Sequence, residues 1–533
     1  MSRRVVPAIA AAPLAAALGE AVPPPTFSAD ADFCVAVMLL GSVAFDMMLF
    51  YWLNYSDDSI RAAAWSVLST SICTFTGVLI GMSWNQSFVY FILGPPEVAG
   101  PVKTILGNLL ASIGWYILLQ VVLMVVSGAV GLRPNSIVTI VLNLKCFGML
   151  LGITTGASSL TMWGLIQTLA PHNLAATVGV LVSCVCTTGF MYRTGAWVRH
   201  FVAHGDGVVD EYERLWDYFV QETEDAALAL SLSYLLVQST CQTLMGWMPL
   251  KTGQAPPGVT PTRGDVLGLL VCGLGYVLLI PVLDLCVSHP KWPRPKSCAK
   301  MVVGKAGAFC LLFSMTWAVA DILDSTAPPA QTVLALGTTF LGMVIILVLE
   351  YLKDLECTGR KFDQEAKALI GPVAVLIGFG WKQAFVGSLT TITAKVRVMP
   401  IPFQTTCMAA VMVAVVVPAW RLHILPKVMK EVVERAEREM ACQNESAPST
   451  SRLGAPLLHE KAEHSDEEEE GEDWNPNKLV IESFARERRN AVVPNEVVRQ
   501  NIVLQHRVAE LEDDIRDICA ELSELREIAA VLA

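Results

Sequence analysis

The sequence predicts an all-α, polytopic membrane protein with about 11 transmembrane helices in a 4+4+3 parallel internal repeat, followed by a cytoplasmic C-terminal coiled coil. Three observations predict this class: long runs with few charges, a segment that returns almost 300 residues later, and a heptad pattern at the end of the chain. Of the 533 residues, 53% are apolar and only 16% are charged, whereas soluble proteins carry about 25% charged residues.

Eleven apolar runs are long enough to cross a ~30 Å hydrocarbon layer as helices. Two of them exceed 30 residues, so we expect these two to tilt, kink or project beyond the bilayer. The runs predict an integral multi-pass protein of the plasma membrane or an endomembrane, surrounded by the lipid bilayer. They cover residues 33–53, 62–93, 104–130, 137–169, 173–195, 226–248, 265–287, 301–323, 331–352, 366–392 and 403–424.

Charge divides the chain into a neutral membrane part and an acidic tail. Residues 441–533 hold ten Lys or Arg and 21 Asp or Glu, so their net charge of −11 equals that of the whole chain. The other 440 residues hold 28 charges of each sign. Nucleic-acid binding needs a basic face, so this balance argues against a nucleic-acid partner.

The first 22 residues allow two interpretations. Arg3 and Arg4 form a basic start, Val5–Leu18 is apolar and small residues follow, which is the pattern of a signal peptide. Pro7 and Pro13 interrupt the apolar stretch, so a disordered leader rich in Ala and Pro is the alternative.

Positive charge predicts the orientation, because Lys and Arg gather on the cytoplasmic side of membrane proteins. They are concentrated in residues 288–305, 353–367 and 421–438. Alternation of the spans then puts the C-terminus in the cytoplasm and the N-terminus outside. Lys395 and Arg397 conflict with this orientation, since they fall in a loop assigned to the outside.

The segment "VLIGMSWNQSFV" (78–89) returns as "VLIGFGWKQAFV" (375–386), with eight of twelve residues identical. Further matches at steady offsets link the second to fourth runs with the sixth to eighth, and the sixth and seventh with the tenth and eleventh. The pattern predicts four-helix units that enter the bilayer in the same direction. The units are 33–170, 171–324 and 331–425, the last without its fourth helix. Chance similarity between apolar segments is the alternative.

A glutamine marks each unit, at Gln86, Gln242 and Gln383. An unpartnered amide in lipid costs several kcal/mol, so each must face protein or water. The three side chains either line a polar pathway or, as we favour, pin neighbouring helices through bonds of about 0.6–2 kcal/mol. Lys382 has no charged counterpart in the other units. It is our first candidate for contact with an anionic group, and a lysine that reaches outward to the interface is the alternative.

Five further charges lie inside apolar runs, where ionisable residues are functional candidates by default. In the predicted topology all five lie near the cytoplasmic ends of their runs. The alternative explanation for the two lysines is therefore that their side chains reach the membrane interface. The alternative for the acids is that they pair with one another or with the lysines. The five are Asp46, Lys145, Asp284, Lys305 and Glu350.

Glycines at every fourth residue predict close helix packing. Gly148, Gly152 and Gly156 form such a ridge in the 137–169 run, and Gly77 and Gly81 do so in the 62–93 run. A row of small residues lets the backbone of a neighbouring helix approach. We interpret both rows as packing signals.

The soluble tail contains three predicted segments: a juxtamembrane helix (427–443), a disordered acidic linker (444–478) and a coiled coil (495–533). Ser465 precedes an acidic run and is a candidate phosphorylation site, with a solvated spacer as the alternative. The heptads predict a parallel homo-oligomer, whose alternative is an amphipathic helix packed on its own chain. The predicted core positions are Asn501, Leu504, Val508, Leu511, Ile515, Ile518, Leu522 and Leu525.

No catalytic motif is apparent, so the sequence predicts no enzyme, no cofactor and no metal site. The favoured function is a solute transporter or ion channel oligomerised by its tail, because internal duplication is typical of transport folds. The alternative is a membrane scaffold or receptor-like organiser that recruits partners through the acidic tail and the coiled coil. The scarcity of deeply placed charges favours that alternative.

Overall fold

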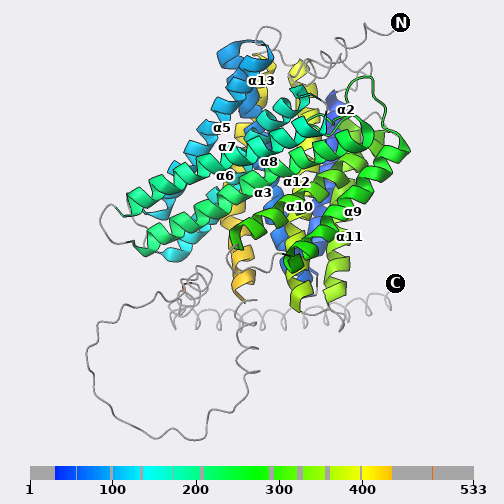
Figure 1. The fold of residues 1–533 in the computed structure, drawn as a ribbon. Coiled ribbons are helices and arrows are strands. Elements are labelled where there is room, and N and C mark those ends of the chain that lie inside the picture. The colour runs from blue at the N-terminus through cyan, green and yellow to red at the C-terminus, as the bar shows by residue number, and fades with distance from the viewer. Residues whose placement is uncertain are drawn as a thin grey trace, which may run out of the picture. The chain divides into compact units, whose positions relative to one another are not determined.

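The computed structural model describes residues 31–55, 57–95, 100–131, 136–171, 173–204, 209–286, 293–320, 328–353, 360–395, 399–434 and 483. All eleven apolar runs of the sequence lie on helices (Figure 1). They are α2 (Ala31–Leu53), α3 (Asp58–Leu93), α5 (Pro101–Ser127), α6 (Ile137–Leu169), α7 (Leu174–Ala203), α8 (Glu211–Met245), α9 (Arg263–Cys286), α10 (Pro293–Ala320), α11 (Pro328–Lys353), α12 (Arg360–Lys395) and α13 (Ile401–Ala419).

Within the described ranges, ten of these helices are long and apolar enough to cross a membrane. The chain is therefore an integral multi-pass membrane protein. The exception is α8. Its apolar run, 226–248, predicts a span, but the helix begins 15 residues before that run, at Glu211. Acidic residues in its N-terminal half and several Ser, Thr and Gln residues in its C-terminal half leave no stretch of α8 apolar enough to be counted with the ten.

Local signals explain where several helices begin and end. The side chains of Asp57, Ser136 and Asn173 accept hydrogen bonds from the first backbone N–H groups of α3, α6 and α7. Asp210 and Glu213 form a capping box at the start of α8, which satisfies donors that a helix start leaves open. Gly246 ends α8 with a φ of +76°, a conformation that favours glycine.

Five helices form a closed ring, in which α3 packs against α6, α6 against α8, α8 against α10, α10 against α12, and α12 against α3. The remaining helices lie outside it: α2 and α11 contact α12, α5 and α7 contact α6 and α8, α9 contacts α10, and α13 contacts α3 (Figure 1). The ring helices α3, α6, α10 and α12 are largely buried, whereas α2, α7 and α9 are mostly exposed.

Apolar side chains from all five ring helices share one core. Met82 of α3 belongs to it together with Tyr234 of α8 and Phe379 of α12. The ring of Phe309 on α10 lies 4.9 Å from that of Phe379 and 5.9 Å from that of Tyr234, both edge-on. Such aromatic packing fills the space between the helices.

The glycine ridge of α6 meets α8, which confirms the predicted packing role. A Cβ atom at Gly152 would lie 2.8 Å from Thr223, and one at Gly156 would lie 2.9 Å from the Ala227 carbonyl oxygen. A Cβ atom at Gly81 of α3 would likewise lie 2.8 Å from the Thr154 carbonyl oxygen of α6. Small residues at these points bring the helix backbones into contact.

The turn at residues 246–262 covers one end of the ring, which we call the capped end. Trp317 of α10 donates from Nε1 to the Gly253 carbonyl at 2.8 Å, and Gln238 of α8 donates to the Pro249 carbonyl at 3.2 Å. Gly253 has a φ of +79°, and a Cβ there would overlap the Phe313 ring. The turn is therefore fixed to the ring helices beneath it.

Several predictions concern regions beyond this description. The leader (1–22), the acidic linker (444–478) and the coiled coil (495–533) lie outside the described residues. The predicted juxtamembrane helix is described as far as Glu434, where the chain that follows α13 is still helical. The internal repeat and the orientation across the membrane stay predictions.

Candidate functional site

Helix α5 carries a polar residue at every fourth position along its buried face. Thr104, Asn108, Ser112 and Tyr116 are each at most 8% exposed, and half-buried Gln120 continues the row. Residues four apart lie on one face of a helix. This polar stripe therefore runs along α5 from the capped end toward the opposite end, against the ring.

In the half near the capped end, the stripe joins a network with α3 and α6. Asn85 donates from Nδ2 to Asn108 Oδ1 and to the Ser158 carbonyl, both at 3.3 Å. The Ser158 hydroxyl donates to Asn85 Oδ1 at 3.0 Å and lies 2.9 Å from the Ser112 hydroxyl. All four side chains are buried, and these bonds satisfy polar groups that would be costly in an apolar surrounding.

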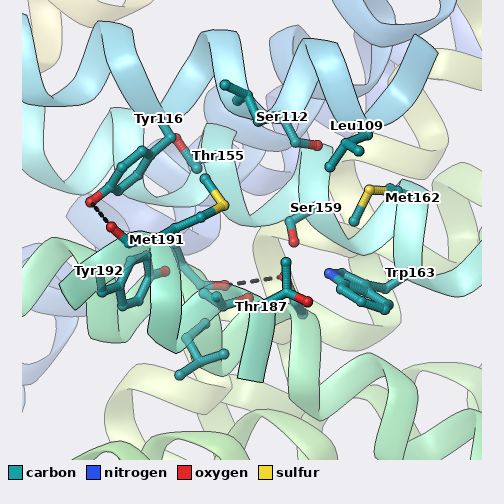
Figure 2. Close-up of a pocket in the computed structure, with 15 residues that line it drawn as sticks. Leu109, Ser112, Tyr116, Thr155, Ser159, Met162, Trp163, Thr187, Met191 and Tyr192 are labelled. Atoms are coloured by element: carbon teal, nitrogen blue, oxygen red, sulfur yellow. Dashed lines mark hydrogen bonds between the residues drawn. The ribbon is translucent and has the colours of Figure 1, made fainter. Parts of the chain in front are cut away.

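A pocket follows the network, between α5, α6, α7 and α8 (Figure 2). Its cavity volume is ≈ 30 Å³, which is room for about two water molecules. Trp163 and Met162 lie at one end and Tyr116 and Tyr192 at the other (Figure 2). Its lining combines apolar side chains with hydroxyls. The hydroxyl-bearing residues are Ser112, Tyr116, Thr155, Ser159, Thr187, Thr188, Tyr192 and Ser231.

One of these hydroxyls has no partner. Thr155 is 6% exposed, and its Oγ1 makes no hydrogen bond. Most buried polar atoms in proteins are paired, so an unpaired one beside a pocket indicates a place where a ligand or water can bind.

Two stacked tyrosines form the far end of the pocket. The Tyr116 and Tyr192 rings lie 5.7 Å apart and nearly parallel. The Tyr116 hydroxyl donates to Glu224 Oε1 at 2.9 Å, with the Met191 carbonyl 3.3 Å away, and the Tyr192 hydroxyl donates to the Glu224 carbonyl at 2.8 Å. The pocket thus leads directly to a buried carboxylate.

Glu224 is the centre of an ionic cluster on α8. Its side chain is fully buried, and Arg199 of α7 donates from Nη1 to Oε1 at 3.0 Å. Gln120 donates to the same oxygen at 3.0 Å, while Arg294 of α10 lies 3.3 Å from Oε2. The carboxylate accepts from three helices besides its own, and charge-assisted bonds of this kind are the stronger ones.

Each arginine of the cluster also binds a second carboxylate. Arg199 donates from Nε to Asp217 at 2.8 Å, and Arg294 donates from Nε to both oxygens of Asp225 at 3.0 Å. Three carboxylates and two guanidinium groups give the cluster a net charge of −1. Arg199 Nη2 is buried and has no hydrogen-bond partner, so the cluster keeps one spare donor.

The predicted intramembrane lysines both reach α8. Lys145 lies 3.3 Å from Glu222, with its amine 5.5 Å from the Phe219 ring, and Lys305 donates to the Ala226 carbonyl at 2.9 Å. These contacts place the two lysines beside the ionic cluster, one from α6 and one from α10.

The predicted acids are dispersed. Asp46 is exposed on α2, whereas Glu350 of α11 is 4% exposed. The side chain of Asp284 lies outside the described residues, as do Ser465 and the coiled-coil core positions. The structure therefore does not gather these acids into the cluster.

The three glutamines do not meet in the structure. Gln86 is exposed, Gln242 donates to the Gly246 carbonyl of its own helix end at 3.4 Å, and Gln383 donates to the Thr252 carbonyl in the capping turn at 2.8 Å. The Gln383 bond joins two segments, which is the pinning role. A shared polar pathway through all three stays a prediction.

Sequence reasoning missed the members of the ionic cluster. Charge pattern places Arg294 in a cytoplasmic loop, and Glu224 falls just before the apolar run of α8. Arg199 follows the apolar run of α7. The four-residue spacing of the polar stripe is the signal that the sequence offers for this site. The stripe ends at Tyr116 and Gln120, whose side chains donate to Glu224.

A scan against protein-family models finds no match, and searches among curated proteins and among solved structures find none either.

Proposed function

We propose that the protein is a solute transporter that works by alternating access along α5. In this proposal the polar stripe is the solute path, the pocket between α5 and α7 is the binding site, and the ionic cluster is the closed gate. The observation that carries the proposal is the continuity of these parts, since Ser112 and Tyr116 belong to the stripe and also line the pocket.

Buried polarity of this extent supports a functional role. Ion pairs inside a membrane protein offset a large desolvation cost only when their geometry is good, and apolar residues would serve packing as well. Polar and charged residues in spans usually mark solute or ion pathways. The cluster lies between α5, α7, α8 and α10, so a change in its bonds would alter the contact of α5 and α7 with the ring.

The arrangement favours a transporter over an open channel. The five-helix ring has an apolar core containing Phe309 and Phe379. The stripe ends at the ionic cluster, where charge-paired side chains from three helices meet. Passage along α5 therefore requires the cluster to rearrange, which is the gating step of alternating access.

The lining indicates a small solute with polar groups. The hydroxyls, among them the unpaired Thr155 Oγ1, offer donors and acceptors, while Trp163 and Met162 offer apolar contact. Ligand sites commonly combine an apolar lining with a few placed polar groups. In the predicted orientation the capped end faces the outside and the ionic cluster lies toward the cytoplasm.

Cysteine accessibility tests the path. We expect Ser112→Cys, in the full-length protein in sealed vesicles, to react with a membrane-impermeant thiol reagent added on the capped side. Ile117→Cys is the matched control, because Ile117 is 56% exposed on the outer face of the same helix and would face lipid. Helix α5 has no native cysteine, so mass spectrometry of its peptides reads each position without background.

Labelling of Ser112→Cys at least ten times faster than Ile117→Cys would support a hydrated path. Equal, slow labelling from both sides would contradict transport along α5, and would favour the scaffold interpretation of the sequence. A third variant, with Glu224→Gln added to Ser112→Cys, is expected to become reactive from the opposite side as well, because the gate is weakened.

A further inference from the structure

Lys382 is a buried cation on α12. It is 6% exposed and lies four residues after Gly378, whose Cβ position faces Ser71 and Thr74 of α3. Lys382 therefore lies on the α12 face toward α3, near the capped end.

Lys251 is a second cation, on the turn that covers the same end. The turn is held in place by bonds from Leu250 N to the Gln254 carbonyl at 2.9 Å and from Gly253 N to the Leu250 carbonyl at 2.7 Å. Burial lowers the pKa of the Lys251 amine below its ordinary value. The Lys251 side chain is half-buried on this turn.

The two lysines are adjacent in space. Their chain neighbours, Thr252 and Gln383, are joined by the 2.8 Å bond from Gln383 Nε2 to the Thr252 carbonyl. This bond holds the two lysine-bearing segments side by side. Neither amine makes a hydrogen bond or ion pair with another residue in the part of the chain that the structure describes.

We propose that Lys251 and Lys382 form a binding site for one small inorganic oxyanion at the capped end of the ring. Two like charges repel each other, and burial strengthens that repulsion. The Lys382 side chain is largely buried, and charges in such places are usually paired, so the two lysines call for an anion between their amines.

The chemistry of the site defines the class of anion. Lysine amines are compact point charges that bind phosphate-like groups without the planar geometry of arginine. Two positive charges match a dianion such as hydrogen phosphate or sulfate better than a halide. Because Lys251 belongs to the covering turn and Lys382 to a ring helix, the bound anion would also fasten the turn to the ring. The inference is independent of transport along α5.

Binding of radiolabelled inorganic phosphate to the purified full-length protein in detergent tests the site, with sulfate and chloride as competitors. We expect saturable binding that sulfate displaces at lower concentration than chloride. Lys382→Met and Lys251→Met should each lower the affinity at least tenfold. Lys103→Met is the control, since Lys103 is exposed at the capped end of α5 and should leave binding unchanged.

Thermal unfolding supplies a second readout. The oxyanion should raise the melting temperature of the wild type and of Lys103→Met, because a ligand that binds only the folded state stabilises it. Lys382→Met should melt higher than the wild type without the anion, since an unpaired buried charge is gone, and should not respond to it. Absence of saturable binding in the wild type would overturn the proposal, as would unchanged binding in both lysine variants.

Discussion

Replacement of Glu224 by glutamine should destabilise the protein far more than replacement of its neighbour Glu222. The Glu224 side chain is fully buried and accepts from Tyr116, Gln120, Arg199 and Arg294. Glutamine keeps one acceptor oxygen but places an NH₂ group against a guanidinium. Loss of the negative charge leaves two arginines with two carboxylates, and the arginine that faces the new NH₂ group loses its acceptor.

The structure sets the magnitude. Breaking a buried ion pair by removing one partner costs about 3–5 kcal/mol. Arg199 retains Asp217 at 2.8 Å and Arg294 retains Asp225 at 2.9 Å, so the lower end, about 3 kcal/mol, is expected. Glu222 pairs with Lys145 at 3.3 Å, with side chains 48% and 30% exposed. An exposed pair of this kind contributes about 0–1 kcal/mol.

Unfolding of the purified variants in mixed micelles by added SDS, followed by far-ultraviolet circular dichroism, gives the free energies. A difference of less than about 1 kcal/mol between Glu224→Gln and Glu222→Gln would refute the buried-cluster reasoning. The double variant with Arg199→Met separates the Glu224–Arg199 interaction from its surroundings, and should cost less than the sum of the two single variants.

Three other outcomes are expected. Gly156→Ala should destabilise the fold by about 1–3 kcal/mol, because the new Cβ would lie 2.9 Å from a carbonyl oxygen of α8. Gly114→Ala is the control: its Cβ would meet nothing within 4 Å, so it should be neutral or stabilising in the same unfolding assay. A cysteine at Ser288 should resist membrane-impermeant reagents in intact cells, and labelling from outside would reverse the predicted orientation. The peptide 496–532 should sediment as an oligomer, and the double substitution Leu511→Ala and Ile518→Ala should make it monomeric. A monomeric wild-type peptide would contradict the coiled coil.

Apolar run length predicted the helices well, because a span must exceed a fixed length whatever it packs against. It failed at the start of α8. Glu211 begins that helix, and a charge such as Glu224 ends an apolar run even where it is buried between two arginines. A hydropathy pattern carries no information about such partners, which come from other helices.

Local spacing predicted packing but not chemistry. The ridge of Gly152 and Gly156 is a contact surface, as its spacing indicates, since small residues four apart have few other uses in a span. That the contacted neighbour is α8 depends on tertiary packing, which the spacing of the glycines does not predict. In the same way, the sequence indicated that Lys382 is unusual among its counterparts, but only the folded turn brings Lys251 beside it.

The candidate site could be predicted in part. The stripe from Thr104 to Gln120 is legible as a four-residue period. Its meaning depends on Arg199 and Glu224, which are separated from it by more than 70 residues. The spatial meeting of these segments is set by packing of α5 and α7 on α6 and α8.

The central claim is that the ionic cluster is a gate whose opening separates α5 from α7 at the end opposite the capping turn. Electron paramagnetic resonance between nitroxide amino acids at Val125 and Phe201, which are 54% and 74% exposed near that end of the two helices, measures this separation directly. The account predicts mainly one short distance in the wild type and an added longer distance in Glu224→Gln. A single distance distribution that is the same in both proteins would contradict it.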